Sequence, residues 1–243
     1  MNKTKIEWCD MTWNPVTGCL HDCEYCYAKR IAERFKPKSP LLHDCSQPGN
    51  GLHEIRYKSQ PYKYGFAPTL HSYRLGNPIG IAKPKRIFVC SMADLFGDWV
   101  PDEWISEVMK ACAKAPQHTY LFLTKNPKRY GNLNLLRYLP PKFILGTTVT
   151  NAHDFMKVPL YFDYLSHSFL SIEPLLGDLA EYINFSKYSW VIVGAQTGPS
   201  PVKPKHEWVQ SIIVQCREAG VPVFLKDNLN WPEKIQEFPE VSP

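Results

Sequence analysis

The sequence lacks any apolar run close to the roughly 20 residues of a membrane helix, which excludes a protein that spans a membrane by helices. Its first ten residues carry two lysines, Glu7 and Asp10 but no apolar core, so we expect no signal peptide. Internal repeats and low-complexity tracts are also missing, which excludes a repeat architecture. Hydrophobic residues make up 44% of the chain, too many for a disordered protein. We therefore expect a globular, cytoplasmic protein.

The length of 243 residues favours one large domain, 1–243, that carries an insertion. Composition changes only at about 37–84, where proline and glycine recur without a helical period. Between Lys36 and Arg86, nine basic residues face only Asp44 and Glu54, although the net charge of the whole chain is +5. We interpret this segment as a basic, loop-rich insertion, because long loops in compact domains are usually binding loops or lids.

After the insertion, short apolar runs alternate with helical patterns. This alternation predicts an α/β fold, in which right-handed βαβ units build a parallel sheet. Helices are predicted at Pro101–Ala115 and Glu207–Ala219. The predicted strands are Arg86–Cys90, Tyr120–Thr124, Phe143–Val149, Ser168–Ile172, Trp190–Val193 and Val221–Leu225.

Polar residues follow most of these strands, and α/β folds place their sites at that edge of the sheet. Strand ends also meet solvent, which would make them polar without any function. The candidates at or just after the ends of successive strands are Ser91, Asp94, Lys125, Thr147, Thr148, Glu173, Gly194, Gln196, Thr197 and Lys226.

The sharpest feature is a cysteine cluster, in which Cys19, Cys23 and Cys26 form the spacing C-x3-C-x2-C. Eight cysteines without a secretory signal indicate a reducing compartment, where a disulfide plus a free thiol is disfavoured. A zinc site would need a fourth ligand, for which His21 and Cys9 are nearest, and no second ligand pair follows. A 4Fe-4S cluster with one iron that no cysteine ligates fits three thiolates.

The C-x3-C-x2-C spacing resembles that of radical S-adenosylmethionine (SAM) enzymes, and Tyr25 matches the aromatic residue that they favour before the last cysteine. Longer stretches resemble a phage-associated, radical-SAM-like family of unassigned function. The chain departs from this family in two ways. Its first two cysteines have the standard radical SAM spacing, whereas many members of the family space them more widely, and its loop 194–199 lacks the family's usual acidic residue. The resembling stretches are Lys5–Trp8, Thr12–Cys19, Cys26–Ala28, Ser91–Phe96, Leu123–Lys125, Ser171–Gly177 and Trp190–Gly194.

The resemblance implies a partial (β/α) barrel of about six or seven parallel strands, with the cluster at the carboxyl ends of the strands. It implies that the cluster reduces SAM to a 5′-deoxyadenosyl radical, which abstracts hydrogen from a substrate. It also implies an external electron donor of the flavodoxin or ferredoxin type. By analogy, Ser91 and Asp94 would meet the SAM amino group. Thr147, Thr148 and Glu173 would meet its ribose or carboxylate, and the 194–197 loop would lie by the adenine.

The substrate class stays open at this stage. Tyrosines and Phe66 alternate with the cations of segment 36–86, a composition typical of nucleic-acid and nucleotide surfaces. A proline-rich loop that packs its tyrosines on the barrel would look the same. Lys125 and Lys226 end strands that should face the cavity and suit an anionic ligand, although a solvated lysine is the plainer interpretation. The alternatives are a peptide or small-metabolite substrate, or a non-catalytic module that binds zinc or nucleic acid.

Overall fold

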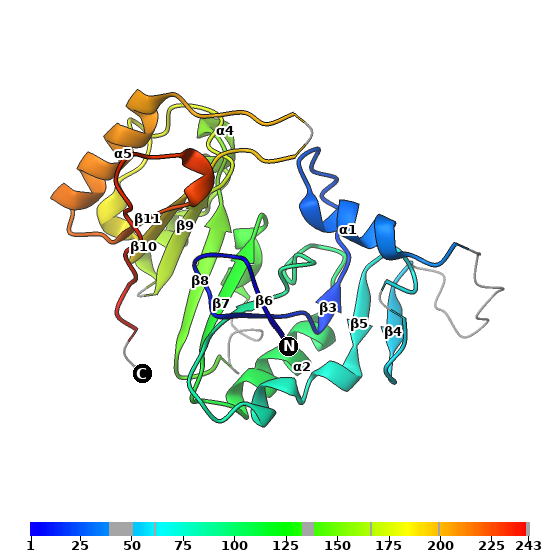
Figure 1. Ribbon diagram of the computed structural model, residues 1–243. Coiled ribbons are helices and arrows are strands. Elements are labelled where there is room, and N and C mark those ends of the chain that lie inside the picture. The colour runs from blue at the N-terminus through cyan, green and yellow to red at the C-terminus, as the bar shows by residue number, and fades with distance from the viewer. Residues whose placement is uncertain (39–50, 61, 133–138, 166, 199, 242–243) are drawn as a thin grey trace.

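The computed structural model describes residues 1–38, 51–60, 62–132, 139–165, 167–198 and 200–241. Its main element is an eight-stranded sheet in the order β1-β2-β6-β7-β8-β9-β10-β11 (Figure 1). β1 pairs antiparallel with β2, and the other seven strands are parallel and form a half-barrel. The predicted α/β partial barrel is thus confirmed. The strands are β1 (Asn2–Lys3), β2 (Met11–Trp13), β6 (Arg86–Val89), β7 (Thr119–Thr124), β8 (Phe143–Thr148), β9 (Ser168–Ile172), β10 (Trp190–Val193) and β11 (Val223–Leu225).

Both faces of the half-barrel are buried, which explains why its strands appear as continuous apolar runs in the sequence. Successive side chains point to opposite faces. On β10, Val191 and Val193 join the larger outer core, while Trp190 and Ile192 join a second core on the inner face. The inner core is mainly aromatic, and Trp8 lies within it, 4.5 Å from Phe88 between ring centroids.

Two long helices pack on the outer core. α2 (Asp102–Ala113) buries Val108 and Met109, and α5 (His206–Glu218) buries Ile212 and Ile213. Both predicted helices are confirmed: α2 begins one residue later and ends two residues earlier than predicted, and α5 begins and ends one residue earlier. The short helical elements are η1 (Ser72–Arg74), η2 (Asn77–Gly80), η3 (Pro127–Gly131), α4 (Ala152–Phe155), η4 (Leu160–Tyr164), η5 (Phe185–Lys187) and η6 (Asp227–Leu229).

A second, three-stranded sheet connects the basic segment to the chain just before the cysteines. β3 (Val16–Thr17) pairs with β5 (Thr69–His71), which also pairs with β4 (His53–Ile55). This small sheet lies beside the main one in Figure 1. Within the expected insertion, 39–50 and 61 lie outside the described residues. The remainder contains β4, β5 and two 3-10 helices, so it is more ordered than a plain loop.

The helix that follows the cysteines, α1 (Tyr27–Phe35), carries Tyr27, Ile31 and Phe35 at helical spacing, but this apolar face is not the one that it buries. It buries only Ala28 and Ala32. Ile31 and Phe35 are 38% and 57% exposed. Small side chains let this helix approach the rest of the fold closely, and its larger apolar side chains remain on the surface.

In the part of the chain that the structure describes, no helix combines the length and apolar character required to cross a membrane.

Candidate functional site

A pocket of about 1080 Å³, counting the space that opens to solvent, lies at the carboxyl ends of the parallel strands. Its walls include the cluster loop, which we define as Cys19–Cys26, the ends of the parallel strands, and Phe66 of the basic segment. Trp8 and Phe88 of the inner aromatic core also line it. The pocket therefore joins the cysteine motif to the polar strand ends.

Gly18 fixes the start of the cluster loop. Its φ is +88°, and an added Cβ would lie 2.3 Å from the carbonyl oxygen of Ala67, so only glycine fits here. The Gly18 amide donates to the Met92 carbonyl at 2.9 Å, and the Cys19 amide donates to the Phe66 carbonyl at 3.3 Å. The loop is thus held between the end of β6 and the basic segment.

The three thiols of the cluster loop all line the pocket. Burial raises the pKa of Cys19 to about 12 and also raises the pKa of Cys23. Cys26 is the N-cap of α1, where its Sγ accepts a hydrogen bond from the Lys29 amide at 3.3 Å. Among the described residues, no group of three or more His, Cys, Asp or Glu side chains is placed so that it could hold a metal ion.

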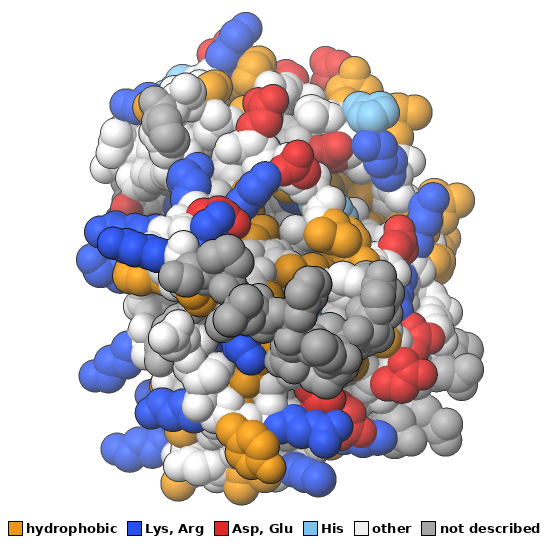
Figure 2. Space-filling view, turned by 90° about the vertical axis from the view of Figure 1, so that its right-hand side faces the viewer, with side chains coloured by type: hydrophobic (Ala, Val, Ile, Leu, Met, Phe, Trp, Pro, Cys, Tyr) orange, Lys and Arg blue, Asp and Glu red, His pale blue; other side chains and the backbone are white. Residues whose placement is uncertain are grey.

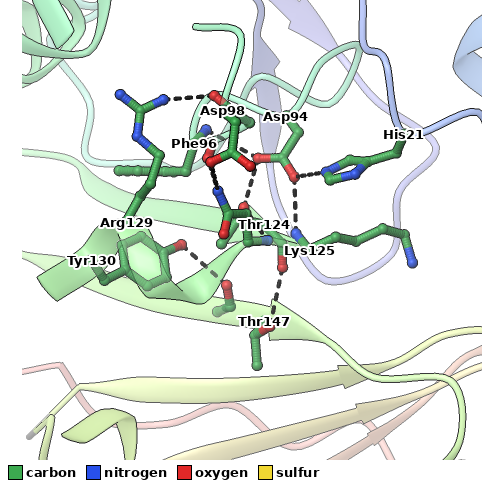
Figure 3. Close-up of polar contacts among 12 residues, drawn as sticks. His21, Asp94, Phe96, Asp98, Thr124, Lys125, Arg129, Tyr130 and Thr147 are labelled. Atoms are coloured by element: carbon green, nitrogen blue, oxygen red, sulfur yellow. Dashed lines mark hydrogen bonds and ion pairs between the residues drawn. The ribbon is translucent and has the colours of Figure 1, made fainter. Parts of the chain in front are cut away.

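Asp94 is the centre of a buried polar network (Figure 3). Its Oδ1 accepts from the Phe96 amide at 3.0 Å and from the Thr124 hydroxyl at 2.7 Å. Its Oδ2 accepts from the Lys125 amide at 2.9 Å and lies 2.7 Å from His21 Nε2. Two backbone amides and one hydroxyl thus donate to Asp94, and the His21 imidazole completes the set of polar groups around the carboxyl group. Asp94 therefore binds the cluster loop to the ends of β6 and β7.

A second contact joins the same two segments. Lys125 Nζ donates to the Tyr25 hydroxyl at 2.9 Å and lies over its ring at 5.4 Å from the centroid. Burial opposes the charged form of Lys125, but interaction with Tyr25, Cys23 and Asp154 outweighs it and raises the pKa above its usual value. The ammonium is thus charged and adjacent to the cluster loop.

On the opposite side of the pocket, Lys226 forms an ion pair with Glu173. Gly194 packs beneath this pair, because an added Cβ there would lie 3.0 Å from Lys226 Cδ and 3.1 Å from Glu173 Cγ. Lys226 is therefore neutralised by a residue of the chain itself, and Glu173 is oriented by it.

The structure brings most of the predicted residues together, and two lie elsewhere. Thr147 is buried behind the sheet, where its hydroxyl donates to the Thr124 carbonyl at 3.1 Å. Gly194 contributes backbone bonds with Ile172 and Leu175 and does not line the pocket. The residues that line it are Cys19, Cys23, Tyr25, Cys26, Ser91, Asp94, Lys125, Thr148, Glu173, Gln196, Thr197 and Lys226.

Sequence reasoning assigned no function to Asn14 or Tyr27, which shape the turn after β6. Asn14 Oδ1 accepts from the Ser91 hydroxyl at 3.2 Å and from the Met92 amide at 3.0 Å. The Tyr27 hydroxyl donates to the Ser91 carbonyl at 2.5 Å. Both residues lie in the stretches that resemble the family. Their place in those stretches was the only feature of the sequence that pointed to a role for them. Cys90 precedes this turn with φ of +60°.

The basic segment is less open than its composition suggests. Tyr57 is 83% exposed, whereas Tyr64 stacks on His53 with 3.9 Å between centroids and Phe66 lines the pocket. Several of its cations have partners within the chain: Lys36 pairs with Glu33, Arg56 with Glu54, Arg86 with Asp10, and Arg74 donates to the Asn14 carbonyl. Figure 2 shows acidic and apolar side chains among the basic ones on this side.

Comparisons with known proteins give a family and a set of similar structures. No curated protein matches the chain. Solved structures of spore photoproduct lyase are similar at a TM-score of 0.47: a complex with dinucleoside spore photoproduct at 12% identity, and a single-site mutant at 14%. Each match covers 89% of this chain and 63% of that one, so the chain spans less than two thirds of those proteins. A family model described as a protein of unknown function (DUF5131) matches residues 3–239. The chain therefore belongs to the DUF5131 family.

Proposed function

We propose that this protein is a radical SAM enzyme, in which Cys19, Cys23 and Cys26 hold a 4Fe-4S cluster and the adjoining pocket takes SAM. One observation supports this most directly: three thiols from one short loop line the same pocket as the polar ends of the parallel strands. Such a pocket, at the carboxyl edge of a parallel sheet, is where α/β folds bind ligands.

The chemistry of the donor set fits the cluster. Thiolates are the usual ligands of iron–sulfur clusters. Cys9 packs into the inner hydrophobic core. Cys90 also lines the pocket, but it is only 2% exposed, packs into the outer core and lies outside the cluster loop. The cluster loop thus offers three sulfur ligands, which leaves one position for SAM. Once bound, cluster and SAM supply a reductive cleavage of a carbon–sulfur bond, which starts hydrogen abstraction from substrate.

The residues of the chain would hold and shield this chemistry. Ser91 and Thr148 present hydroxyls at the ends of β6 and β8, and Gln196 and Thr197 extend the far wall. The inner aromatic core closes the half-barrel below the pocket, because Trp8 is only 2% exposed and packs on Phe88. A wall of this kind keeps water from a reactive intermediate.

We further propose a nucleotide or a nucleic-acid base as the substrate class. Tyr25 and Phe66 offer aromatic surfaces in the pocket, and base–aromatic stacking tolerates every base. Phe66 comes from the basic segment, so that segment contributes an aromatic side chain to the pocket wall. An external electron donor of the flavodoxin or ferredoxin type would supply the reducing electron.

The test is anaerobic reconstitution with iron and sulfide, followed by dithionite and SAM, with 5′-deoxyadenosine as the product measured. We expect production by the wild type and by the control Cys216→Ala, whose side chain is buried in the outer core. Each of Cys19→Ala, Cys23→Ala and Cys26→Ala should produce none. Added nucleosides or oligonucleotides, but not peptides, should increase the yield.

One tightly bound zinc per chain, with no product after iron loading, would overturn the enzyme proposal in favour of a binding module. Stimulation by peptides or small metabolites alone would overturn only the substrate class.

A further inference from the structure

Two side-chain contacts on either side of Cys23 tie the cluster loop to one short stretch of the sheet edge. His21 Nε2 lies 2.7 Å from Asp94 Oδ2, and the Tyr25 hydroxyl accepts from Lys125 Nζ at 2.9 Å. The two contacts share an anchor, because the Lys125 amide donates to the same Asp94 oxygen at 2.9 Å. Figure 3 shows His21 and Lys125 on the same side of the Asp94 carboxylate.

The anchor on the sheet side is rigid. The Asp94 side chain is 7% exposed, and its other oxygen is held by the Phe96 amide and the Thr124 hydroxyl. Thr124 ends β7 and accepts in turn from the Asn126 amide at 2.9 Å. A shift of Asp94 would therefore break several buried hydrogen bonds, whose loss is costly in an apolar environment.

The loop has weaker support of its own. Its main chain is held by the hydrogen bond from Cys19 to Phe66 and by a 3.0 Å bond from the Cys26 amide to the Cys23 carbonyl. Asp22, in the middle, has a φ of +52°, a conformation that costs a non-glycine residue energy. The His21 ring also meets the Trp99 ring edge-on, at 4.9 Å between centroids. Asp22 also pairs with Lys29, but both side chains are exposed, so the buried support for the part of the loop that carries Cys23 comes from His21 and Tyr25.

We propose that His21 and Lys125 are positioning residues: together with Asp94 they latch the cluster loop to the end of β7 and set the spacing of the three thiols before any cofactor binds. Lys125 then serves the loop and is not a substrate ligand, which replaces our interpretation from the sequence. Asp94 likewise uses its oxygens within the protein and does not bind the SAM amino group. These contacts are present in the cofactor-free chain. That they serve to position the three thiols for a cluster rests on the proposed function.

The experiment measures hydrogen exchange by mass spectrometry in the cofactor-free protein, on peptides that contain the cluster loop. His21→Leu and Lys125→Met each remove one contact. We expect exchange in the loop to become about tenfold faster in each variant, because the hydrogen bond that is lost involves a charged group. His21→Gln and Lys125→Arg keep a donor at a similar reach and should restore most of the protection. The control is Asp98→Asn, because Asp98 lies in the same turn but bonds to Asn126.

A residue with a general structural role would speed exchange throughout the sheet, so β7 and β8 peptides must stay unchanged in all variants. Loop exchange that is the same in His21→Leu, Lys125→Met and wild type would overturn the latch. Iron and sulfide content after reconstitution gives the second measurement. A wild type that assembles no iron cluster, while both variants still loosen the loop, would overturn the proposed function and leave the latch standing.

Discussion

The substitution Asp94→Asn examines the network at the centre of the site most directly. It changes one oxygen to an NH2 group and keeps the size and shape of the side chain. Each Asp94 oxygen faces one backbone amide, that of Phe96 or that of Lys125, and neither amide can become an acceptor. Whichever way the new amide turns, one N–H group therefore meets another N–H group inside a buried site.

The cost follows from the bonds lost. A hydrogen bond to a charged group contributes roughly 1.5–3 kcal/mol to stability. A buried amide that is left without an acceptor costs a further free energy of about 1–3 kcal/mol. The His21 and Thr124 contacts weaken at the same time, because the charge is gone. We therefore expect the free energy of unfolding to fall by about 2–4 kcal/mol, which corresponds to a decrease in Tm of roughly 4–16 °C for a chain of this length.

The assay is urea unfolding of the cofactor-free protein, followed by tryptophan fluorescence and by circular dichroism to check that the transition has two states. Asp98→Asn, at an exposed position in the same turn, should change the free energy by less than about 0.5 kcal/mol. If Asp94→Asn matches this control in stability but loses affinity for SAM, then Asp94 is a ligand for the cofactor and our reasoning about its network is wrong.

Two further predictions concern the two cores. Gly146→Ala would place a Cβ 2.2 Å from the ring of Phe169 in the inner core, so we expect the free energy of unfolding, measured in urea, to fall by about 1–3 kcal/mol. An unchanged urea midpoint would show that the ring has room to move. Burial raises the pKa of the Cys216 thiol to about 12, so this thiol should resist iodoacetamide in the native protein at pH 8 and react in urea; labelling of native Cys216 at pH 8 would contradict this. Because the pKa is near 9 in the unfolded chain, the contribution of Cys216 to stability is present below pH 9 and is lost as the pH rises toward 12.

The strands of the main sheet could be predicted because burial on both faces leaves a continuous apolar run, as in Trp190–Val193. β2, of three residues, was missed, and so were β4 and β5 of the small sheet. Strands this short carry too few residues for a period to show. They form because partners far apart in the chain meet, as Val16 does with Leu70.

Residue spacing alone indicated the candidate site residues: three cysteines in one loop, and polar residues at the ends of successive strands. The tertiary structure decided which of these residues share a site. Thr147 and Thr148 are adjacent on β8, and since neighbouring side chains on a strand point to opposite faces, Thr148 alone lines the pocket. The sequence could not say which of the two would do so, because that depends on which face of the sheet the cluster loop covers. The same holds for Lys125, whose ammonium bonds to Tyr25 because the fold brings together two residues 100 positions apart.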